Sequence, residues 1–166
     1  MALDFAELAQ PRYRWSPGLA WMRDDGIVWS RDDSLTRYNL AREVARATAR
    51  QALAETGKES DARKIATAKA VNAILALAQS DPRLVVRAAA WDADLMALNT
   101  PKGVVDLRTG MLRARGAAEY VTQAARVAPA AGPCPTWLLF LDQVFMGDRD
   151  LIEFMRRWSG YCLTGD

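Results

Sequence analysis

The chain has 166 residues, a formal net charge of +2 and 51% hydrophobic residues, which is enough apolar material for a folded core and excludes a disordered chain. It contains no histidine, so Ser–His and Cys–His nucleophile pairs and the commonest zinc ligand are excluded. Its two cysteines do not make a disulfide framework, and its longest apolar runs fall short of the roughly 20 residues that a membrane-spanning helix needs.

A β-hairpin is predicted for residues 12–33. The pair Asp25-Gly26 is a strong signal for a tight turn, and aromatic and aliphatic stretches containing Trp21 and Trp29 flank it.

Helices are predicted from residue 34 to residue 90. The first covers 34–55, with Ser34 as its expected N-cap. It carries a row of like charges at a spacing of four residues, Arg42, Arg46 and Arg50, which repel one another by a few tenths of a kcal/mol per pair. Solvent and salt on an open face, an anionic ligand such as phosphate, or a partner subunit would each compensate for this repulsion.

A second helix is predicted for 60–79, because apolar residues recur there at core spacing: Val71, Ile74, Leu75 and Ala78. Asp81-Pro82 is typical of an N-cap followed by proline at the first helical position. It predicts a short third helix that runs toward Ala90.

Residues 91–115 contain the turn-rich stretch WDADLMALNTPKGVVDLRTG, Trp91 to Gly110. Val104–Leu107 is predicted as a short strand and Met111–Arg113 as its return strand, with Gly110 in the turn between them. A small hairpin is therefore expected in the second half of this stretch.

A pair of helices is predicted over 136–162. Thr136 is the expected cap of the first helix, Gly147 ends it, and Asp148 caps the second. The apolar positions of both helices are expected to belong to the hydrophobic core: Trp137, Phe140, Leu141, Val144, Leu151, Phe154, Met155 and Trp158.

These elements together predict an α+β fold that is predominantly helical, with about five helices and two small β-hairpins. We expect a single domain over residues 1–166. The N-terminus lacks a basic region followed by an apolar one, so no signal peptide is predicted and a cytoplasmic location is expected.

No catalytic centre is evident in the sequence. A phosphate-binding P-loop needs G-x-x-x-x-G-K-[ST], whereas the one Gly-Lys pair, Gly57-Lys58, is followed by Glu59. The carboxylates of Asp92, Asp94 and Asp106 could in principle bind Mg²⁺, but their setting suits turns and caps better. We therefore expect no catalytic residue, metal site or cofactor in this chain.

The charge distribution favours a weakly basic region after residue 101. Five basic residues and two acidic ones lie between Lys102 and Arg126, a local balance of +3 (5 minus 2). Lysine and arginine side chains in register can contact a nucleic-acid backbone, and the composition permits this without requiring it.

The stretch from Trp91 to Gly110 resembles the signature of phage and plasmid primase–helicases, in which a Trp-Asp segment leads into a Leu-Asn-Thr-Pro-x-Gly-x-x-Asp-Leu-Arg-Thr-Gly run. The block CPTWLLFLDQVFMGDRDLIEFMRRWSGYCLTGD, within 133–166, is similar to the Cys-Pro-x-Trp block of the same family. The upstream WMRDDGIVWSRDDS is similar to its Trp-rich hairpin. Three blocks in the same order make the resemblance specific.

The resemblance implies the domain immediately N-terminal to a superfamily 3 helicase, also known as a poxvirus-type NTPase N-terminal-like domain. It implies replication of a phage, prophage or plasmid in a bacterial host cell. ATP and Mg²⁺ would be bound by the helicase domain of the parent protein, and a primase module could lie upstream. We expect this chain to be an excised domain or a truncated product.

The leading hypothesis is a non-catalytic connector that positions the helicase motor on single-stranded or forked DNA. Its first candidates for DNA contact are Lys102, Arg108, Arg113 and Arg115, and its second candidates are Arg42, Arg46 and Arg50. Its expected partners are DNA, the helicase domain of the same parent chain and a homo-oligomer, with no membrane. The alternative is an oligomerisation collar or a protein-docking domain without DNA contact. A third hypothesis, a self-contained enzyme that uses Asp92 or Asp106, is the least favoured.

Overall fold

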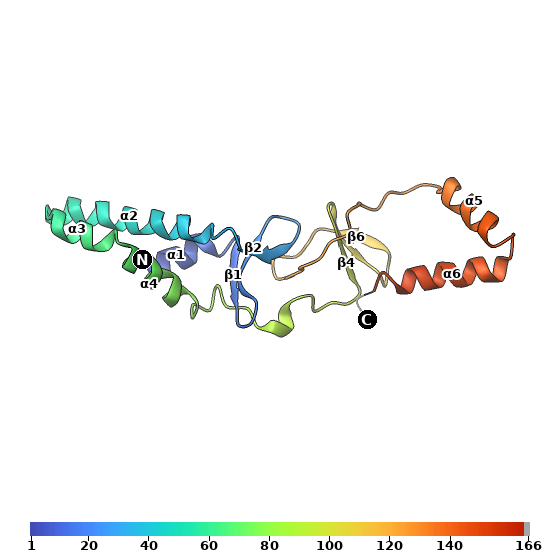
Figure 1. Ribbon diagram of the computed structural model, residues 1–166, viewed down its shortest axis with the longest axis horizontal. Helices are drawn as coiled ribbons and strands as arrows, with labels where there is room; N and C mark the ends of the chain where they lie inside the picture. The colour runs from blue at the N-terminus through green and yellow to red at the C-terminus, as the bar shows by residue number, and fades with distance from the viewer. Residues whose placement is uncertain (165–166) are drawn as a thin grey trace. The chain divides into compact units, whose positions relative to one another are not determined.

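The computed structural model describes residues 1–164 and divides into two compact units, unit 1 (Met1–Trp91) and unit 2, which begins at Asp92. It has six α-helices and two three-stranded antiparallel sheets, so the predicted helix-rich α+β class is confirmed (Figure 1). Within the described residues, no helix is both long and apolar enough to cross a membrane. The single-domain organisation stays a prediction.

The first sheet lies in unit 1 and has the strand order β1-β2-β3, with β1 at Tyr13–Ser16, β2 at Ala20–Asp24 and β3 at Trp29–Arg31. The predicted tight turn forms between β2 and β3, where the Asp25 carboxylate accepts the backbone N–H groups of Ile27 and Val28 at 2.8 Å each. A second turn after Ser16 divides the first predicted arm into two strands, which is why the hairpin becomes a three-stranded sheet.

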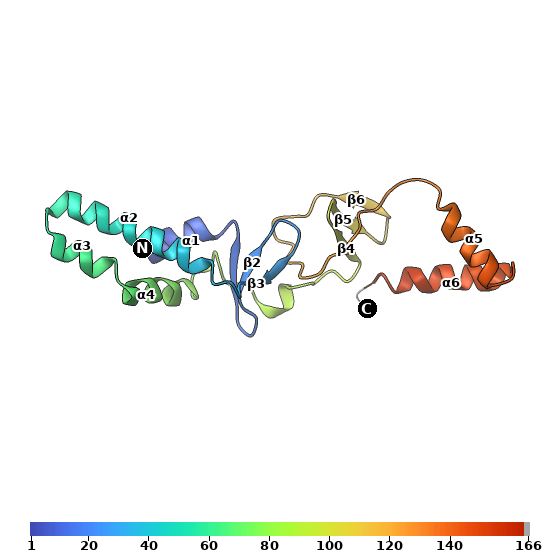
Figure 2. The same ribbon diagram turned by 45° about the horizontal axis from the view of Figure 1, so that its top comes forward.

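Four helices complete unit 1: α1 (Ala2–Ala9), α2 (Arg37–Thr56), α3 (Glu59–Ile65) and α4 (Ala68–Ala78). Figures 1 and 2 show α2 running beside α3 and α4, with α1 against α2 and α4. The helix predicted for 60–79 is interrupted because Thr67 adopts an extended conformation and caps α4, its hydroxyl accepting the N–H of Ala70 at 3.2 Å.

The prediction of a short helix after Asp81-Pro82 is wrong. Asp81 instead accepts the backbone N–H and the guanidinium of Arg83, which makes a turn. The chain then runs extended beside β1, where Trp15 donates its N–H to the carbonyl of Leu84 and accepts the N–H of Val86, both at 2.8 Å. Only a three-residue 3₁₀ helix, η1 (Ala88–Ala90), precedes Trp91.

The core of unit 1 lies where α1, α2 and α4 meet the first sheet. Phe5 of α1 is fully buried and meets the indole of Trp21 edge to face, with ring centroids 6.0 Å apart. The four positions predicted from α4 periodicity, Val71, Ile74, Leu75 and Ala78, are all buried. Edge-to-face contacts of this kind stabilise a core beyond the area that they bury.

Asp32 joins the first sheet to α2. Its side chain is fully buried. One carboxylate oxygen accepts hydrogen bonds from the N–H and the hydroxyl of Thr36, at 3.1 and 2.7 Å. The other oxygen accepts hydrogen bonds from the N–H and the guanidinium of Arg37, at 3.1 and 3.0 Å. The carboxylate of Asp32 therefore performs the capping predicted for Ser34, so the prediction of Ser34 as the cap is wrong. Burial would raise the pKa of Asp32, but the hydrogen bonds from Thr36 and Arg37 together hold it below 3.8.

The second sheet lies in unit 2, with β4 at Ala97–Thr100, β5 at Gly103–Asp106 and β6 at Met111–Arg113 in that order. The predicted hairpin of β5 and β6 is confirmed, and β4 is an additional strand. Gly103 has a φ of +132°, and a Cβ there would overlap the carbonyl oxygen of Arg113 on β6. Glycine is therefore required where β5 begins, because any side chain would push the two strands apart.

Unit 2 also contains the predicted helical pair, as α5 (Pro135–Val144) and α6 (Arg149–Tyr161). The Asp148 carboxylate caps α6 by accepting the N–H groups of Asp150 and Leu151 at 3.0 Å each, as predicted. At α5 the predicted cap, Thr136, is wrong: the N-cap is Cys134, and Pro135 takes the first position of the helix.

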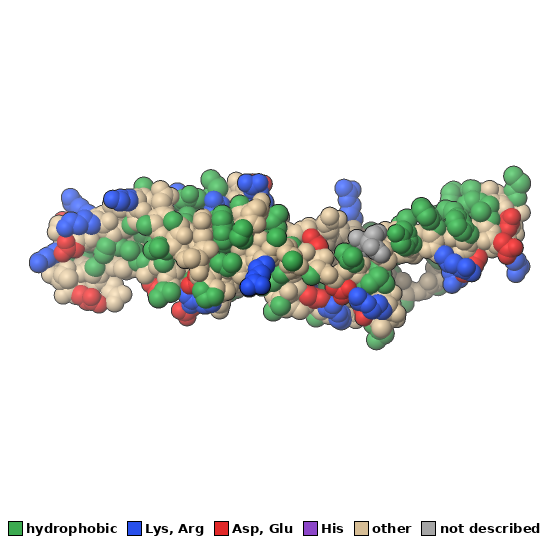
Figure 3. All heavy atoms as spheres, turned by 90° about the horizontal axis from the view of Figure 1, so that it is seen from below, with side chains coloured by type: hydrophobic (Ala, Val, Ile, Leu, Met, Phe, Trp, Pro, Cys, Tyr) green, Lys and Arg blue, Asp and Glu red, His purple; other side chains and the backbone are tan. Residues whose placement is uncertain are grey.

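The apolar faces of α5 and α6 are not core, which corrects the prediction made from their periodicity. Leu141 is buried, but Trp137, Phe140, Phe154 and Trp158 are each about half exposed, at 50–56%. Figure 3 shows hydrophobic side chains gathered over these two helices. Two short helices alone cannot cover both of their own apolar faces, which is why these side chains remain exposed.

We predict that Asp32→Ala lowers the free energy of unfolding of unit 1 by about 3 kcal/mol at pH 7, because it leaves a largely buried guanidinium without its partner and removes the cap of α2. Since the pKa of Asp32 is lowered, its contribution is complete above the unfolded-state pKa and is lost as the pH falls below 3.8 through the folded-state pKa. The difference between variant and wild type should therefore shrink in acid.

Urea unfolding followed by near-ultraviolet circular dichroism measures this difference. The matched control is Asp33→Ala, which removes an ion pair with Arg31 whose side chains are mostly exposed and should change stability by less than about 1 kcal/mol. Equal effects of the two substitutions would contradict the role given to Asp32.

Candidate nucleic-acid interface

The basic residues proposed from the sequence form two groups. Lys102, Arg108, Arg113 and Arg115 lie on or next to the second sheet in unit 2, and are called the sheet group. Arg42, Arg46 and Arg50 lie on α2 in unit 1, and are called the helix row. The two groups differ in how many acidic side chains surround them.

Arg108, in the turn between β5 and β6, is held by carboxylates. Its guanidinium donates to both oxygens of Asp94 at 2.8 and 3.2 Å and lies 3.8 Å from a carboxylate oxygen of Asp106. The hydrogen bonds from Arg108, followed by the N–H of Met96, lower the pKa of the Asp94 carboxyl. The positive charge of Arg108 is therefore largely neutralised within unit 2.

Arg113 on β6 is neutralised in the same way. Its guanidinium donates to both oxygens of Glu119, which also accepts the N–H of Gly116. The hydrogen bond from Arg113 is the largest cause that lowers the pKa of Glu119. Arg115 is half-buried just beyond the strand, and Lys102 is exposed in the turn between β4 and β5.

The local charge of the sheet group is smaller than the sequence window indicated. The count between Lys102 and Arg126 omitted Asp94 and Asp92, which lie upstream and belong to the same unit. Including them changes the balance from +3 to +1 (five basic and four acidic residues over 92–126). The pairing of Asp94 with Arg108 spans 14 residues of sequence, so no local pattern could have identified it.

The helix row lacks such neutralisation. Arg42, Arg46 and Arg50 are exposed, and among residues 1–164 none of the three has a carboxylate within ion-pairing distance. Arg42 donates to a neutral acceptor, the side-chain oxygen of Asn39, at 2.8 Å. On the opposite face of α2, Val44 is buried in the core, so the helix cannot rotate to hide the row.

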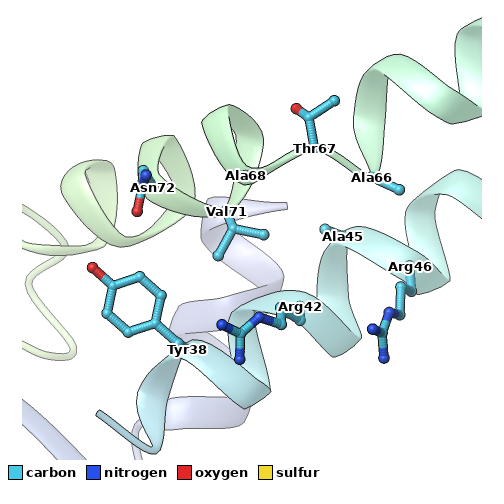
Figure 4. Close-up of a pocket in the computed structure, with 9 residues that line it drawn as sticks. All are labelled: Tyr38, Arg42, Ala45, Arg46, Ala66, Thr67, Ala68, Val71 and Asn72. Carbon is cyan, nitrogen blue, oxygen red and sulfur yellow. The ribbon is translucent and has the colours of Figure 1, made fainter.

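Two members of the helix row border a cavity of about 430 Å³ between α2 and α4. Figure 4 shows Tyr38, Arg42 and Arg46 along α2, across from Val71 and Asn72 of α4. Arg50 lies one turn further along α2 and does not line the cavity. The spacing of the arginines is evident in the sequence, but the cavity is not, since it depends on how α2 and α4 pack together.

The carboxylates considered for Mg²⁺ hold loops together in this structure. Asp92 accepts the N–H of Thr122 at 2.7 Å and the hydroxyl of the same residue, and Asp94 pairs with Arg108. Within the described residues, no group of three or more histidine, cysteine or acidic side chains could hold a metal ion. The expectation of no metal, cofactor or catalytic residue stays a prediction.

The model of the protein family described as "D5 N terminal like" matches residues 3–146. No curated protein and no solved structure matches the chain.

We predict that Arg108→Gln raises the pKa of the Asp94 carboxyl toward its ordinary 3.8, because the guanidinium that stabilises the carboxylate is lost. A pH titration of the carboxyl carbon signals by nuclear magnetic resonance measures it. Arg126→Gln is the control and should leave the Asp94 titration unchanged. An unchanged titration in Arg108→Gln would show that the pair does not persist in solution.

Proposed function

The chain belongs to the D5 N-terminal-like family, the domain that precedes a superfamily 3 helicase in phage and plasmid primase–helicases. We propose that it is a non-catalytic connector that contacts DNA and positions the helicase motor on that DNA. Family membership implies association with a helicase domain of the same parent chain. ATP and Mg²⁺ would act in that helicase domain, and single-stranded or forked DNA would be the partner of the connector.

The observation that carries this proposal is the helix row. Arg42, Arg46 and Arg50 repeat every four residues, so they form one line along an exposed face of a 20-residue helix. Three guanidiniums in a line repel one another, and a phosphate backbone, which is a regular line of negative charge, would compensate for that repulsion. The buried opposite face of α2 keeps the row directed outward.

The sheet group becomes the weaker candidate for DNA contact. To bind phosphate, Arg108 and Arg113 would have to break hydrogen-bonded pairs with Asp94 and Glu119, and the released carboxylates would repel DNA. Lys102 remains open to solvent, because its side chain has no ion pair among residues 1–164. The order of the two groups is therefore the reverse of the order expected from the sequence.

We predict that the triple substitution Arg42→Gln, Arg46→Gln and Arg50→Gln weakens binding to single-stranded DNA and flattens its salt dependence. Three lost phosphate contacts should reduce the slope of log K against log salt by about 2, at about 0.7 per contact on single strands. Fluorescence anisotropy titrations with single-stranded and forked DNA, each at several salt concentrations, measure both effects.

The matched control is a second triple variant in the other unit, Lys102→Gln, Arg108→Gln and Arg113→Gln, which removes the same formal charge. It should change the slope by less than 1, since two of its three arginine or lysine side chains are already neutralised. A larger loss in the control would assign the DNA contact to the sheet group. No binding by the folded wild type at low salt would remove the DNA role.

A second candidate function is an oligomerisation collar or a docking domain without DNA contact, and the exposed apolar faces of α5 and α6 favour it. Phe154 and Trp158 stack with their ring centroids 6.5 Å apart and remain about half exposed. Contiguous exposed apolar surface of this kind marks contact with another protein surface. A connector docked on a helicase domain would use the same faces, so the two functions differ in DNA contact.

If α5 and α6 mediate self-association, the mass of the chain in solution should rise above 18.4 kDa as concentration increases. Phe154→Gln with Trp158→Gln should restore the monomer, as sedimentation velocity would show. The control is Leu3→Gln with Leu8→Gln, which alters two exposed leucines of α1 and should leave association unchanged. A wild type that stays at the monomer mass at every concentration would contradict the collar.

A further inference from the structure

The cavity between α2 and α4 combines apolar and cationic lining residues, whereas contact with phosphates by the helix row would require only the cationic ones. Its inner wall is apolar, formed by the ring of Tyr38 and the side chains of Ala45 and Val71. Its rim is polar and cationic, formed by Arg42 and Arg46 on one side and Asn72 on the other (Figure 4). An apolar wall with convergent polar groups is the usual composition of a small-ligand site.

The cationic rim is suited to a phosphate group. Arg42 uses one nitrogen on the neutral Asn39, and Arg46 has no hydrogen bond or ion pair among the described residues. Guanidinium donors that are not committed to a carboxylate can form paired hydrogen bonds with phosphate oxygens. The two arginines are one turn apart, so a single phosphate between them would relieve their mutual repulsion.

The inner wall of the cavity, together with Asn72 of α4, is suited to a nucleobase. Tyr38 is half-buried against the core, and the guanidiniums of Arg37 and Arg42 lie 5.1 and 6.0 Å from its ring centroid. The ring is therefore held in place while part of it faces the cavity. Asn72 is exposed and its amide has no partner within residues 1–164, which leaves a donor and an acceptor for a base edge. Aromatic rings bind bases of any sequence, because every base has a π-face.

We propose that this cavity holds one nucleotide of a single-stranded nucleic acid, with its phosphate at Arg42 and Arg46 and its base against Tyr38 and Val71. This inference rests on the proposed function, since it assumes that the helix row binds the strand. A volume of about 430 Å³ lies at the small end of ligand pockets, enough for one nucleotide unit. The open mouth lets the strand continue along α2 toward Arg50.

The first test compares an ordinary thymidine oligonucleotide with an abasic strand of the same length and charge. If a base occupies the cavity, the wild-type chain should bind the abasic strand at least about fivefold more weakly, the low end of the stacking contribution of one base. Tyr38→Leu keeps an apolar side chain but removes the aromatic ring, and should abolish this preference. Asn72→Ala, an exposed substitution, should reduce it while leaving the fold intact.

The helix row supplies a matched pair of variants. Arg46→Gln and Arg50→Gln remove the same charge from the same face of α2, but only Arg46 lines the cavity. Both should weaken binding of the abasic strand to a similar extent. Arg46→Gln should in addition reduce the preference for the strand with bases, because the phosphate at the cavity is no longer held.

Photocrosslinking tests the location without any substitution. A strand that carries 5-iodouracil should crosslink to the wild-type chain at Tyr38 when irradiated, and mass spectrometry of the peptides should identify that residue. Crosslinks confined to the second sheet would overturn the proposal. Free thymidine monophosphate is the competitor that distinguishes a nucleotide within a strand from a free nucleotide. An inhibition constant below the dissociation constant of the strand would reassign the cavity to a free nucleotide.

The outcomes separate this inference from the proposed function. If the wild type binds no strand at low salt, the DNA-contacting connector itself fails. If it binds ordinary and abasic strands equally, and Tyr38→Leu changes nothing, α2 contacts DNA through phosphates alone and the nucleotide cavity is overturned.

Discussion

The buried carboxylate of Asp32 determines where α2 begins, and much of unit 1 depends on that starting point. Asp32 follows β3 directly, so hydrogen bonds to Thr36 and Arg37 link the sheet to the first turn of the helix. A helix that begins at a defined residue has a defined rotational phase, because successive residues turn by a constant angle. That phase places Val44 and Ala45 in the core and directs Arg42 and Arg46 outward, where they border the cavity with α4.

The two basic groups show that formal charge is a poor guide to an anion-binding surface. The sheet group has as many basic residues as a phosphate site needs, yet its two β-hairpin arginines are bound by Asp94 and Glu119. The helix row has fewer basic residues, but none of them is paired with an acid within residues 1–164. An electrostatic attraction for DNA depends on the charge left after internal pairing, which favours the helix row.

Unit 2 presents the opposite chemistry at α5 and α6. α6 is capped by the side chain of Asp148 whereas α5 has no side-chain cap, and most of their aromatic side chains remain exposed. An amphipathic helix obtains most of its stability from packing of its apolar face, so these helices are suited to a contact with another protein surface. In a family whose members precede a helicase domain, a docking contact on these two helices agrees with the connector role proposed above.

The elements that local chemistry controls could be predicted from the sequence: the turn at Asp25-Gly26, the hairpin closed around Gly110, the Asp148 cap of α6 and the helix-rich α+β class. Turns, caps and periodicity involve neighbours within a few residues, so a linear pattern contains them. Burial does not follow from such patterns. The spacing of Val71, Ile74 and Leu75 matches that of Leu151, Phe154 and Met155, yet the first set is core and the second lies on α6, a helix without buried residues. Three features depend instead on contacts between residues distant in the chain, so they follow from the tertiary structure alone. These are which apolar faces are buried, which arginines pair with a carboxylate, and the cavity that Tyr38, Arg46 and Asn72 line together.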